Sequence, residues 1–200
     1  WGTSIEEEGT FALGNHIGTI TYKNAETGSH DIPTSVAWMY RKNAEIVAGY
    51  ANSTSLVVYN AENGKQIMQL KLPKSTNSAC QQPNKVIYSE EMNFIISGHE
   101  DNRINFFDSN SGILIKSVLG HTDAVTSLSI NKMRNHLASV SHDGTLRIWD
   151  MRNFQCLSET MVHSKKFDEA AHCVSYTNNQ TDMLATGGAD GIVKIIGYNQ

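Results

Sequence analysis

The chain has 200 residues, 40% of them hydrophobic, which is enough for a packed core. Its net charge of −4 excludes a general affinity for the phosphates of DNA or RNA, which requires clustered Lys and Arg. No stretch approaches the roughly 18 consecutive apolar residues of a membrane helix, so we expect no direct membrane insertion.

The three cysteines, Cys80, Cys156 and Cys173, are widely spaced and odd in number. This spacing fits neither a disulfide framework nor a CxxC metal site, so it indicates reduced thiols. We therefore expect a cytoplasmic protein, either free or peripheral to membranes or the cytoskeleton. Because the chain starts at Trp1 without an initiator Met, we also expect that further sequence precedes it.

Four similar segments follow one another along the chain, and each contains an apolar run closed by a small polar residue or a glycine. These runs cover residues 56–60, 103–108, 146–150 and 192–197. A period of about 40–50 residues, built only from short strands and turns, is typical of β-propeller blades. The third segment carries the clearest motif, since Gly120-His121 opens it and Trp149-Asp150 closes its apolar run.

The pattern of apolar runs and turns predicts short strands in the same order in each segment. Inner strands are expected at 35–39, 85–88, 125–130 and 173–176, and second strands at 46–49, 94–98, 137–140 and 184–187. The apolar runs above form the third strands, and exposed fourth strands are expected at 66–72, 113–118 and 156–161. Turns such as Asp143-Gly144 separate the second and third strands, because twisted hairpins need residues that accept positive φ.

These patterns predict an all-β fold and resemble the blades of a WD-repeat β-propeller. Because such propellers usually close with about seven blades, the resemblance implies that this chain holds about four consecutive C-terminal blades of a seven-bladed ring. The expected blades cover residues 30–72, 80–118, 121–161 and 163–198, and residues 1–29 are the remnant of a preceding blade with its linker. An open arc of four blades would expose strand edges and apolar faces, which favours a larger ring. The alternative is a small propeller that closes on itself.

Four residues of the third segment, His121, Ser139, Asp143 and Trp149, have the spacing of the WD-repeat hydrogen-bond tetrad. A His, a Ser and an Asp also invite comparison with a hydrolase triad, but no nucleophile elbow such as G-x-S-x-G accompanies them. We therefore expect a structural network, in which the indole donates to Ser139, Ser139 bonds His121, and Asp143 holds the imidazole.

The other segments keep only parts of this tetrad and replace its Trp. The partial sets are Ser97 with Asp101 and Phe107, Thr186 with Asp190, His163 and Ile196, and Asn52 with Tyr59. The sequence His99-Glu100-Asp101 is interpreted as a turn, because adjacent ligands on a strand and a tight turn point in different directions and cannot share a metal. We predict no catalytic residue, cofactor or metal ligand.

Several motifs are more specific than the general WD repeat. They are Ser78-Ala79-Cys80-Gln81, Gly98-His99-Glu100-Asp101-Asn102-Arg103-Ile104, His121-Thr122-Asp123-Ala124-Val125-Thr126-Ser127-Leu128, Ser141-His142-Asp143, His163-Ser164-Lys165-Lys166-Phe167-Asp168-Glu169-Ala170-Ala171-His172, and Gly188-Ala189-Asp190 with Val193-Lys194. Together they resemble the last blades of the striatin family, and the segment that begins at His163 is the most specific. Gly191-Ile192 and the ending Ile195-Ile196-Gly197-Tyr198 depart from the family pattern, which indicates a divergent member.

The resemblance implies a non-catalytic scaffold that serves as a regulatory subunit of protein phosphatase 2A. Such scaffolds assemble the phosphatase with Ste20-type kinases, a Mob-family protein and a striatin-interacting protein. The family's coiled coil and its caveolin- and calmodulin-binding segments lie N-terminal to the propeller, so oligomerisation is expected through segments that are not in this chain.

Partner contacts are expected on loops at the propeller faces, where turns cluster. Glu100, His142 and Ala189 precede the turn Asp of their segments and are expected on one face, with Lys165 and Lys166 as second candidates. The main alternative is a WD-repeat scaffold of another complex, such as a ubiquitin-ligase receptor, a G-protein-type adaptor or a ciliary adaptor. A central-channel enzyme is disfavoured, because the inner strands offer no converging carboxylates.

Overall fold

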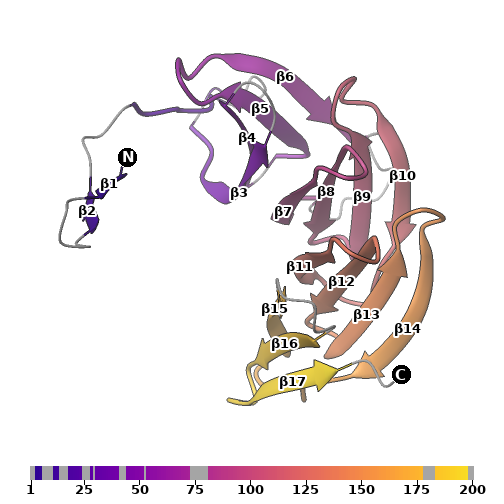
Figure 1. The fold of residues 1–200 in the computed structure, drawn as a ribbon. Coiled ribbons are helices and arrows are strands. Elements are labelled where there is room, and N and C mark those ends of the chain that lie inside the picture. The colour runs from indigo at the N-terminus through magenta and orange to yellow at the C-terminus, as the bar shows by residue number, and fades with distance from the viewer. Residues whose placement is uncertain are drawn as a thin grey trace.

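The computed structural model describes residues 3–5, 11–13, 18–23, 28, 30–40, 44–51, 53–72, 81–177 and 183–197. Every regular element in this part of the chain is a β-strand, and four antiparallel sheets stand side by side around an arc (Figure 1). The predicted all-β propeller fold is therefore confirmed. No helix long and apolar enough to span a membrane occurs among these residues.

Each sheet, here called a blade, runs in chain order from an inner strand to an outer strand. Blade 1 consists of β3 (Pro33–Tyr40), β4 (Ala44–Tyr50), β5 (Ser55–Asn60) and β6 (Gln66–Lys71). Blade 2 consists of β7 (Pro83–Ser89), β8 (Phe94–His99), β9 (Arg103–Asp108) and β10 (Leu114–Leu119). Blade 3 consists of β11 (Val125–Asn131), β12 (His136–Ser141), β13 (Thr145–Asp150) and β14 (Gln155–Met161). In the described residues blade 4 has three strands, β15 (Ala171–Tyr176), β16 (Met183–Gly188) and β17 (Val193–Gly197).

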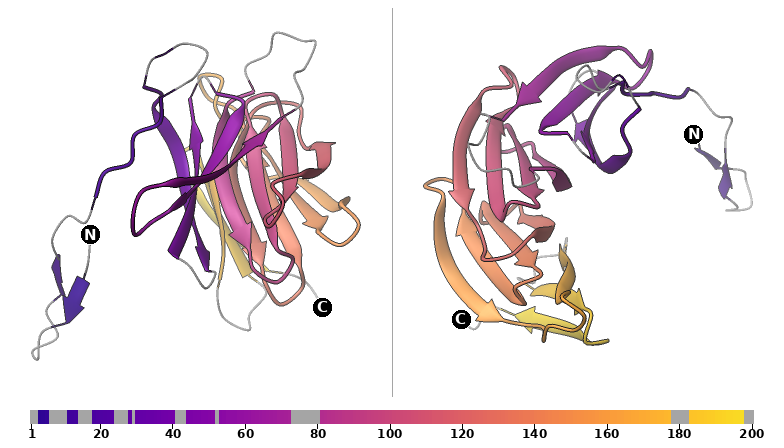
Figure 2. Two further views of the ribbon diagram at one scale, coloured as in Figure 1. Left: turned by 90° about the horizontal axis from the view of Figure 1, so that it is seen from above. Right: turned by 180° about the vertical axis from the view of Figure 1, so that it is seen from behind.

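The N-terminal strands β1 (Thr3–Ile5) and β2 (Phe11–Leu13) pair with each other and lie away from the arc (Figure 2). Residues 18–23 instead run against blade 1. The ring of Tyr22 stacks on that of Tyr50 with their centroids 4.6 Å apart, and Gln69 Nε2 donates to the Tyr22 hydroxyl over 3.2 Å. This segment therefore covers part of the first blade.

A β-bulge at the same place in every inner strand connects one blade to the next. The bulged residues of the first three blades, Thr34, Asn84 and Thr126, each donate a side-chain hydrogen bond to a carbonyl at the start of the next inner strand. The acceptors are the carbonyl oxygens of Pro83, Val125 and Ala171, at 2.5, 3.2 and 2.7 Å respectively. Because a bulge turns an extra side chain out of the ladder, it frees a polar group for this contact.

Buried apolar clusters fill the interfaces between blades. Ile104 and Phe106 of blade 2 belong to one cluster with Val125 and Trp149 of blade 3. The blades approach so closely that a Cβ atom added to Gly98 would lie 2.6 Å from Val125 Cγ1. The blades therefore pack as interlocked layers rather than as separate sheets.

The two ends of the arc expose apolar side chains. On β3, Val36 and Tyr40 are 62% and 70% exposed, and on β17, Val193 and Ile195 are 73% and 75% exposed. The corresponding blade faces inside the arc are buried against their neighbours, so these two faces have the composition of an interface.

Candidate functional site: the polar networks and the turn face

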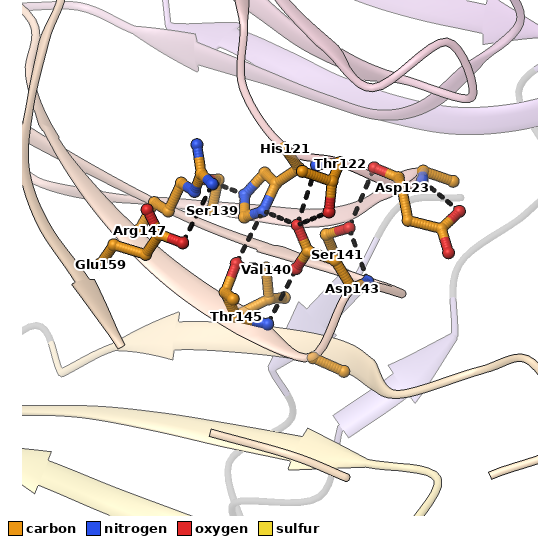
Figure 3. A network of polar contacts seen from close by, with 12 residues as sticks. His121, Thr122, Asp123, Ser139, Val140, Ser141, Asp143, Thr145, Arg147 and Glu159 are labelled. Carbon is orange, nitrogen blue, oxygen red and sulfur yellow. Dashed lines mark hydrogen bonds and ion pairs between the residues drawn. The ribbon is translucent and has the colours of Figure 1, made fainter. Parts of the chain in front are cut away.

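A chain of hydrogen bonds crosses blade 3 from its third strand, β13, to the turn between β12 and β13. Trp149 Nε1 donates to Ser139 Oγ over 2.9 Å, and Ser139 Oγ lies 2.7 Å from His121 Nε2. His121 Nδ1 lies 3.0 Å from Asp143 Oδ2, so the network reaches the turn between β12 and β13 (Figure 3). The structure thus brings all four predicted tetrad residues together.

The chemistry of Asp143 fixes the direction of this network. An ionised carboxylate only accepts, so His121 donates from Nδ1 and its Nε2 accepts the Ser139 hydroxyl proton. Asp143 also accepts from the backbone amides of Thr122 and Thr145, at 3.0 and 2.8 Å. Ser139 is closed to solvent and its hydroxyl is committed on both sides, so no substrate can reach it as a nucleophile.

The pKa of Asp143 is the result of two opposed effects. Burial alone would raise the pKa of this carboxyl, but hydrogen bonds from His121, Thr145 and the Thr122 amide outweigh it and hold the pKa well below the ordinary value of 3.8. A carboxylate whose pKa is lower in the folded state stabilises the fold above the unfolded pKa. This contribution is lost as the pH falls through the folded pKa.

We therefore expect Asp143→Asn to lower the free energy of unfolding at pH 7 by about 1–3 kcal/mol, because it removes a charge-assisted network from a buried site. Below about pH 4 the difference between the two proteins should shrink, because the Asp143 carboxyl of the unfolded wild-type chain then takes up protons while that of the folded protein stays ionised. Urea denaturation at a series of pH values measures both effects. If the free energies of unfolding of the two proteins differed by the same amount from pH 7 down to about pH 2, the ionised Asp143 carboxylate would not be the source of the stabilisation.

Blade 4 holds a similar network that ends on a threonine. His163 Nδ1 lies 3.0 Å from Asp190 Oδ1, and His163 Nε2 lies 3.0 Å from Thr186 Oγ1. Hydrogen bonds from His163 and two backbone amides outweigh the effect of burial and lower the pKa of Asp190. Gly188 leaves room for the imidazole, because an added Cβ would lie 2.6 Å from His163 Nδ1.

Blade 2 departs from the sequence prediction. Ser97 Oγ bonds His99 Nε2 at 2.7 Å, and His99 Nδ1 bonds the carbonyl oxygen of Gln81 at 2.7 Å. Asp101, which the sequence pairs with Ser97 in a partial tetrad, lies outside this network, and its Oδ1 is buried without a hydrogen-bond partner. His99 stands on β8 two residues after Ser97, so the imidazole is supplied from within the sheet. Phe107 is fully buried at the position of Trp149.

Blade 1 has the least polar version. Its third strand carries Tyr59, whose hydroxyl lies 3.0 Å from that of Tyr50, and Ala48 stands where Ser139 stands in blade 3. Asn52, the predicted substitute for the turn Asp, lies outside the described residues. This blade therefore depends on aromatic packing more than on a polar network.

The predicted partner-binding residues lie at equivalent turns. The backbone amides of Glu100, His142 and Ala189 each donate to a carbonyl just before or at the start of an inner strand. The acceptors are the carbonyl oxygens of Gln82, Ala124 and Ala170, at 3.0, 3.1 and 2.7 Å. The same backbone contact in successive blades places these turns on one surface, here called the turn face.

The side chains on the turn face differ in their exposure and in the hydrogen bonds or ion pairs that they already form. Glu100 is exposed and accepts from Asn84 Nδ2 at 2.8 Å. His142 is half-buried and its Nδ1 accepts from the Ala170 amide at 3.4 Å. Lys165 Nζ forms a 2.8 Å ion pair with Asp123, whereas Lys166 is exposed and has no carboxylate within ion-pair distance in the described part of the chain. The two lysines therefore do different things: Lys165 joins two loops and Lys166 faces solvent.

Sequence reasoning assigned no role to three residues: His99 in the buried network of blade 2, and Asp123 and Phe167 at the turn face. A histidine two positions after the strand serine was the available signal for His99. The Asp123–Lys165 pair joins loops 42 residues apart, and no local pattern predicts it. Phe167 is 90% exposed in a turn without Gly or Asn, which is an unusual place for an aromatic residue.

Comparison with known families first identifies the repeat. The model of the WD domain, G-beta repeat, matches residues 112–150. This span runs from the outer strand of blade 2 to the third strand of blade 3, so the sequence repeat and the blade are out of phase.

Comparison with curated proteins gives longer matches. The chain is 32% identical to the striatin homolog of Dictyostelium discoideum over 96% of its length, and 35% identical to striatin-4 of Mus musculus over 84%. It is 33% identical to striatin of Homo sapiens over 85% of its length. The chain spans less than a quarter of each of these relatives, at 24%, 22% and 22%.

Solved structures support the fold. The WD40 repeats of RRP9 match 84% of this chain and 48% of theirs, with a TM-score of 0.71 at 19% identity. The computationally designed Ika4 protein matches 94% of this chain over its whole length, with a TM-score of 0.70 at 21% identity. At these identities the likeness concerns the fold alone.

Proposed function

Because this chain is a WD-repeat region of the striatin family, we propose that it docks partners in an assembly of protein phosphatase 2A with Ste20-type kinases. A protein-interaction scaffold is the role that the family and the repeat support. The proposed partners are the phosphatase subunits, a Ste20-type kinase, a Mob-family protein and a striatin-interacting protein. The region itself performs no chemistry in this proposal, and the protein acts in the cytoplasm.

The observation that carries the proposal is the turn face, where rigid loops present Glu100, His142, Ala189 and Lys166 from successive blades. Buried networks below the face hold the loops in place, so binding costs little loop ordering. A scaffold that holds a kinase and a phosphatase on one body makes their encounter intramolecular and raises their effective concentration. The apolar end faces of the arc fit a ring with further blades, seven in all.

Affinity purification of the full-length protein from its native cells, followed by quantitative mass spectrometry, tests the assignment. We expect phosphatase 2A scaffold and catalytic subunits together with a Mob-family protein. Recovery of ubiquitin-ligase or ciliary subunits in their place would assign the protein to another complex instead of the phosphatase assembly. The propeller fold would not be affected by that result.

Charge reversal on the turn face tests the surface itself. We expect Glu100→Lys to weaken at least one partner by about 5-fold, because exposed charge pairs at an interface contribute up to about 1 kcal/mol. The melting temperature should change little, since the Glu100 side chain is exposed and the hydrogen bond that it accepts from Asn84 lies at the surface. Unchanged recovery of every partner would remove Glu100 from the interface.

A further inference from the structure

The loop between β14 and β15 ends in a turn that is costly for its sequence. Phe167 and Asp168 both have positive φ, at 52° and 67°. Two backbone hydrogen bonds close the turn, from Lys166 N to Glu169 O at 2.7 Å and from Glu169 N to Lys166 O at 3.1 Å. This is the arrangement of a type I′ turn, which strongly prefers Asn and Gly because side chains crowd the left-handed region.

Phe154 has the same unfavourable backbone conformation, but there the packing of its ring compensates for it. It also has a positive φ, of 60°, but its ring packs against Phe106 and Phe94 with centroids 4.9 and 6.0 Å away. Phe167 is 90% exposed, and in the described part of the chain its ring has one partner, Lys166 Nζ at 5.9 Å from the centroid. The two backbone hydrogen bonds hold the turn, but no packing of the ring against the described residues compensates for the left-handed backbone and the exposed apolar surface of Phe167.

The base of the loop is held firmly on both sides. Lys165 is bound to Asp123, and the amide of Ser164 donates to Asp190 Oδ2 over 3.2 Å. At the other end Ala170 is fully buried and its amide donates to His142. The aromatic ring is thus presented at the tip of a preorganised hairpin, which lowers the entropic cost of binding.

We infer that Phe167 is an anchor that inserts into an apolar pocket of a partner protein whose rim carries a carboxylate facing Lys166. Large aromatic side chains dominate binding energy when a pocket desolvates them. Lys165 is already neutralised by Asp123, so Lys166 is the cation of this loop that remains for a partner. Its position beside the ring means that an acid reaching Lys166 borders the pocket for Phe167. Only the identity of the partner rests on the proposed function.

Site-specific photocrosslinking in the full-length protein finds the partner. The crosslinking residue p-benzoylphenylalanine replaces Phe167 in native cells, and in a parallel protein it replaces Met133. Met133 is the matched control because it is 83% exposed and lies in the turn between β11 and β12, on the opposite side of the blades. We expect position 167 to crosslink one protein strongly and position 133 not to do so. Equal labelling from both positions, or crosslinks only between two copies of this chain, would overturn the inference.

Affinity measurements with the purified crosslinked protein then test the chemistry. We expect Phe167→Ala to weaken binding by about 30-fold and Met133→Ala to leave it unchanged. Lys166→Glu should weaken it by about 5-fold, whereas Lys166→Arg should preserve it. Replacing Phe167 by Asn and Asp168 by Gly gives the preferred type I′ sequence, so this variant should melt at the same or a higher temperature and still lose binding. Undiminished affinity of that variant would refute the anchor.

The identity of the captured protein separates this inference from the proposed function. A member of the phosphatase–kinase assembly supports both. A protein from another complex that needs Phe167 and Lys166 supports the anchor and contradicts the phosphatase assembly. A captured assembly member whose affinity does not change on Phe167→Ala leaves the proposed function standing and removes the anchor.

Discussion

Replacing Trp149 with alanine is expected to lower the free energy of unfolding by about 3–5 kcal/mol. The indole is 5% exposed and belongs to the cluster between blades 2 and 3, so its removal opens a cavity there. It also removes the donor to Ser139 at the centre of the buried network. Denaturation followed by circular dichroism in the full-length protein measures the loss without relying on the fluorescence of the deleted residue.

Trp149→Phe separates the two contributions. Phenylalanine keeps most of the volume but cannot donate to Ser139, and Phe107 shows that the fold accepts it at the equivalent position of blade 2. We expect a loss of about 1–2 kcal/mol for this variant, which is the cost of one buried hydrogen bond with its partner left behind. A loss below about 1 kcal/mol for Trp149→Ala would show that the blade interface collapses around the missing ring.

The strands could be predicted because each blade repeats a local pattern. Apolar runs of strand length, separated by turns such as Asp143-Gly144, occur at a regular period, and the four sheets lie where these runs lie. The blade 3 residues His121, Ser139 and Asp143 stand at spacings that are fixed by strand length and register. The local sequence pattern is therefore enough to predict both the all-β fold class and the position of the blade 3 network.

The blade 4 network joins the residues named from the sequence, since His163 lies between Thr186 and Asp190. The blade 2 network could not be predicted in the same way, because a hydrogen bond depends on where a ring lies and not on its place in the sequence. In blade 2 the imidazole of His99 comes from β8 itself. Contacts between blades, such as Thr126 with the Ala171 carbonyl, join residues 45 positions apart. No local pattern encodes them.

The buried networks and the turn face are connected by hydrogen bonds. Asp143, which bonds His121, belongs to the turn that presents His142. The Nδ1 of His142 accepts a hydrogen bond from the amide of Ala170, at the base of the Phe167 hairpin. A change in the network is therefore expected to loosen the recognition loops before it unfolds the blade. Mutations at buried and exposed positions can thus reduce binding for different reasons, and only the former should also lower the melting temperature.

Replacing Gly144 with alanine is expected to destabilise the protein by about 2–4 kcal/mol, for two separable reasons. The residue has a φ of +83°, where an alanine side chain costs about 1–2 kcal/mol. An added Cβ would also overlap the backbone oxygen of His163 and lie 2.9 Å from Met161 Sδ. Relief requires movement of the segment whose Val162 and His163 amides both donate to the Gly144 carbonyl, at 2.9 and 3.1 Å.

Gly191→Ala is the matched control. Gly191 occupies the equivalent turn of blade 4 with a φ of +79°, but an added Cβ would meet nothing within 4 Å. This variant should lose only the backbone contribution of about 1–2 kcal/mol, so the difference between the two measures the steric contact with the His163 segment. Because that segment leads into the Phe167 hairpin, Gly144→Ala should also weaken partner binding, whereas Gly191→Ala should leave it near the wild-type level. Equal losses of stability in the two variants would mean that the loop before β15 moves freely away from blade 3, and that it does not present a rigid hairpin.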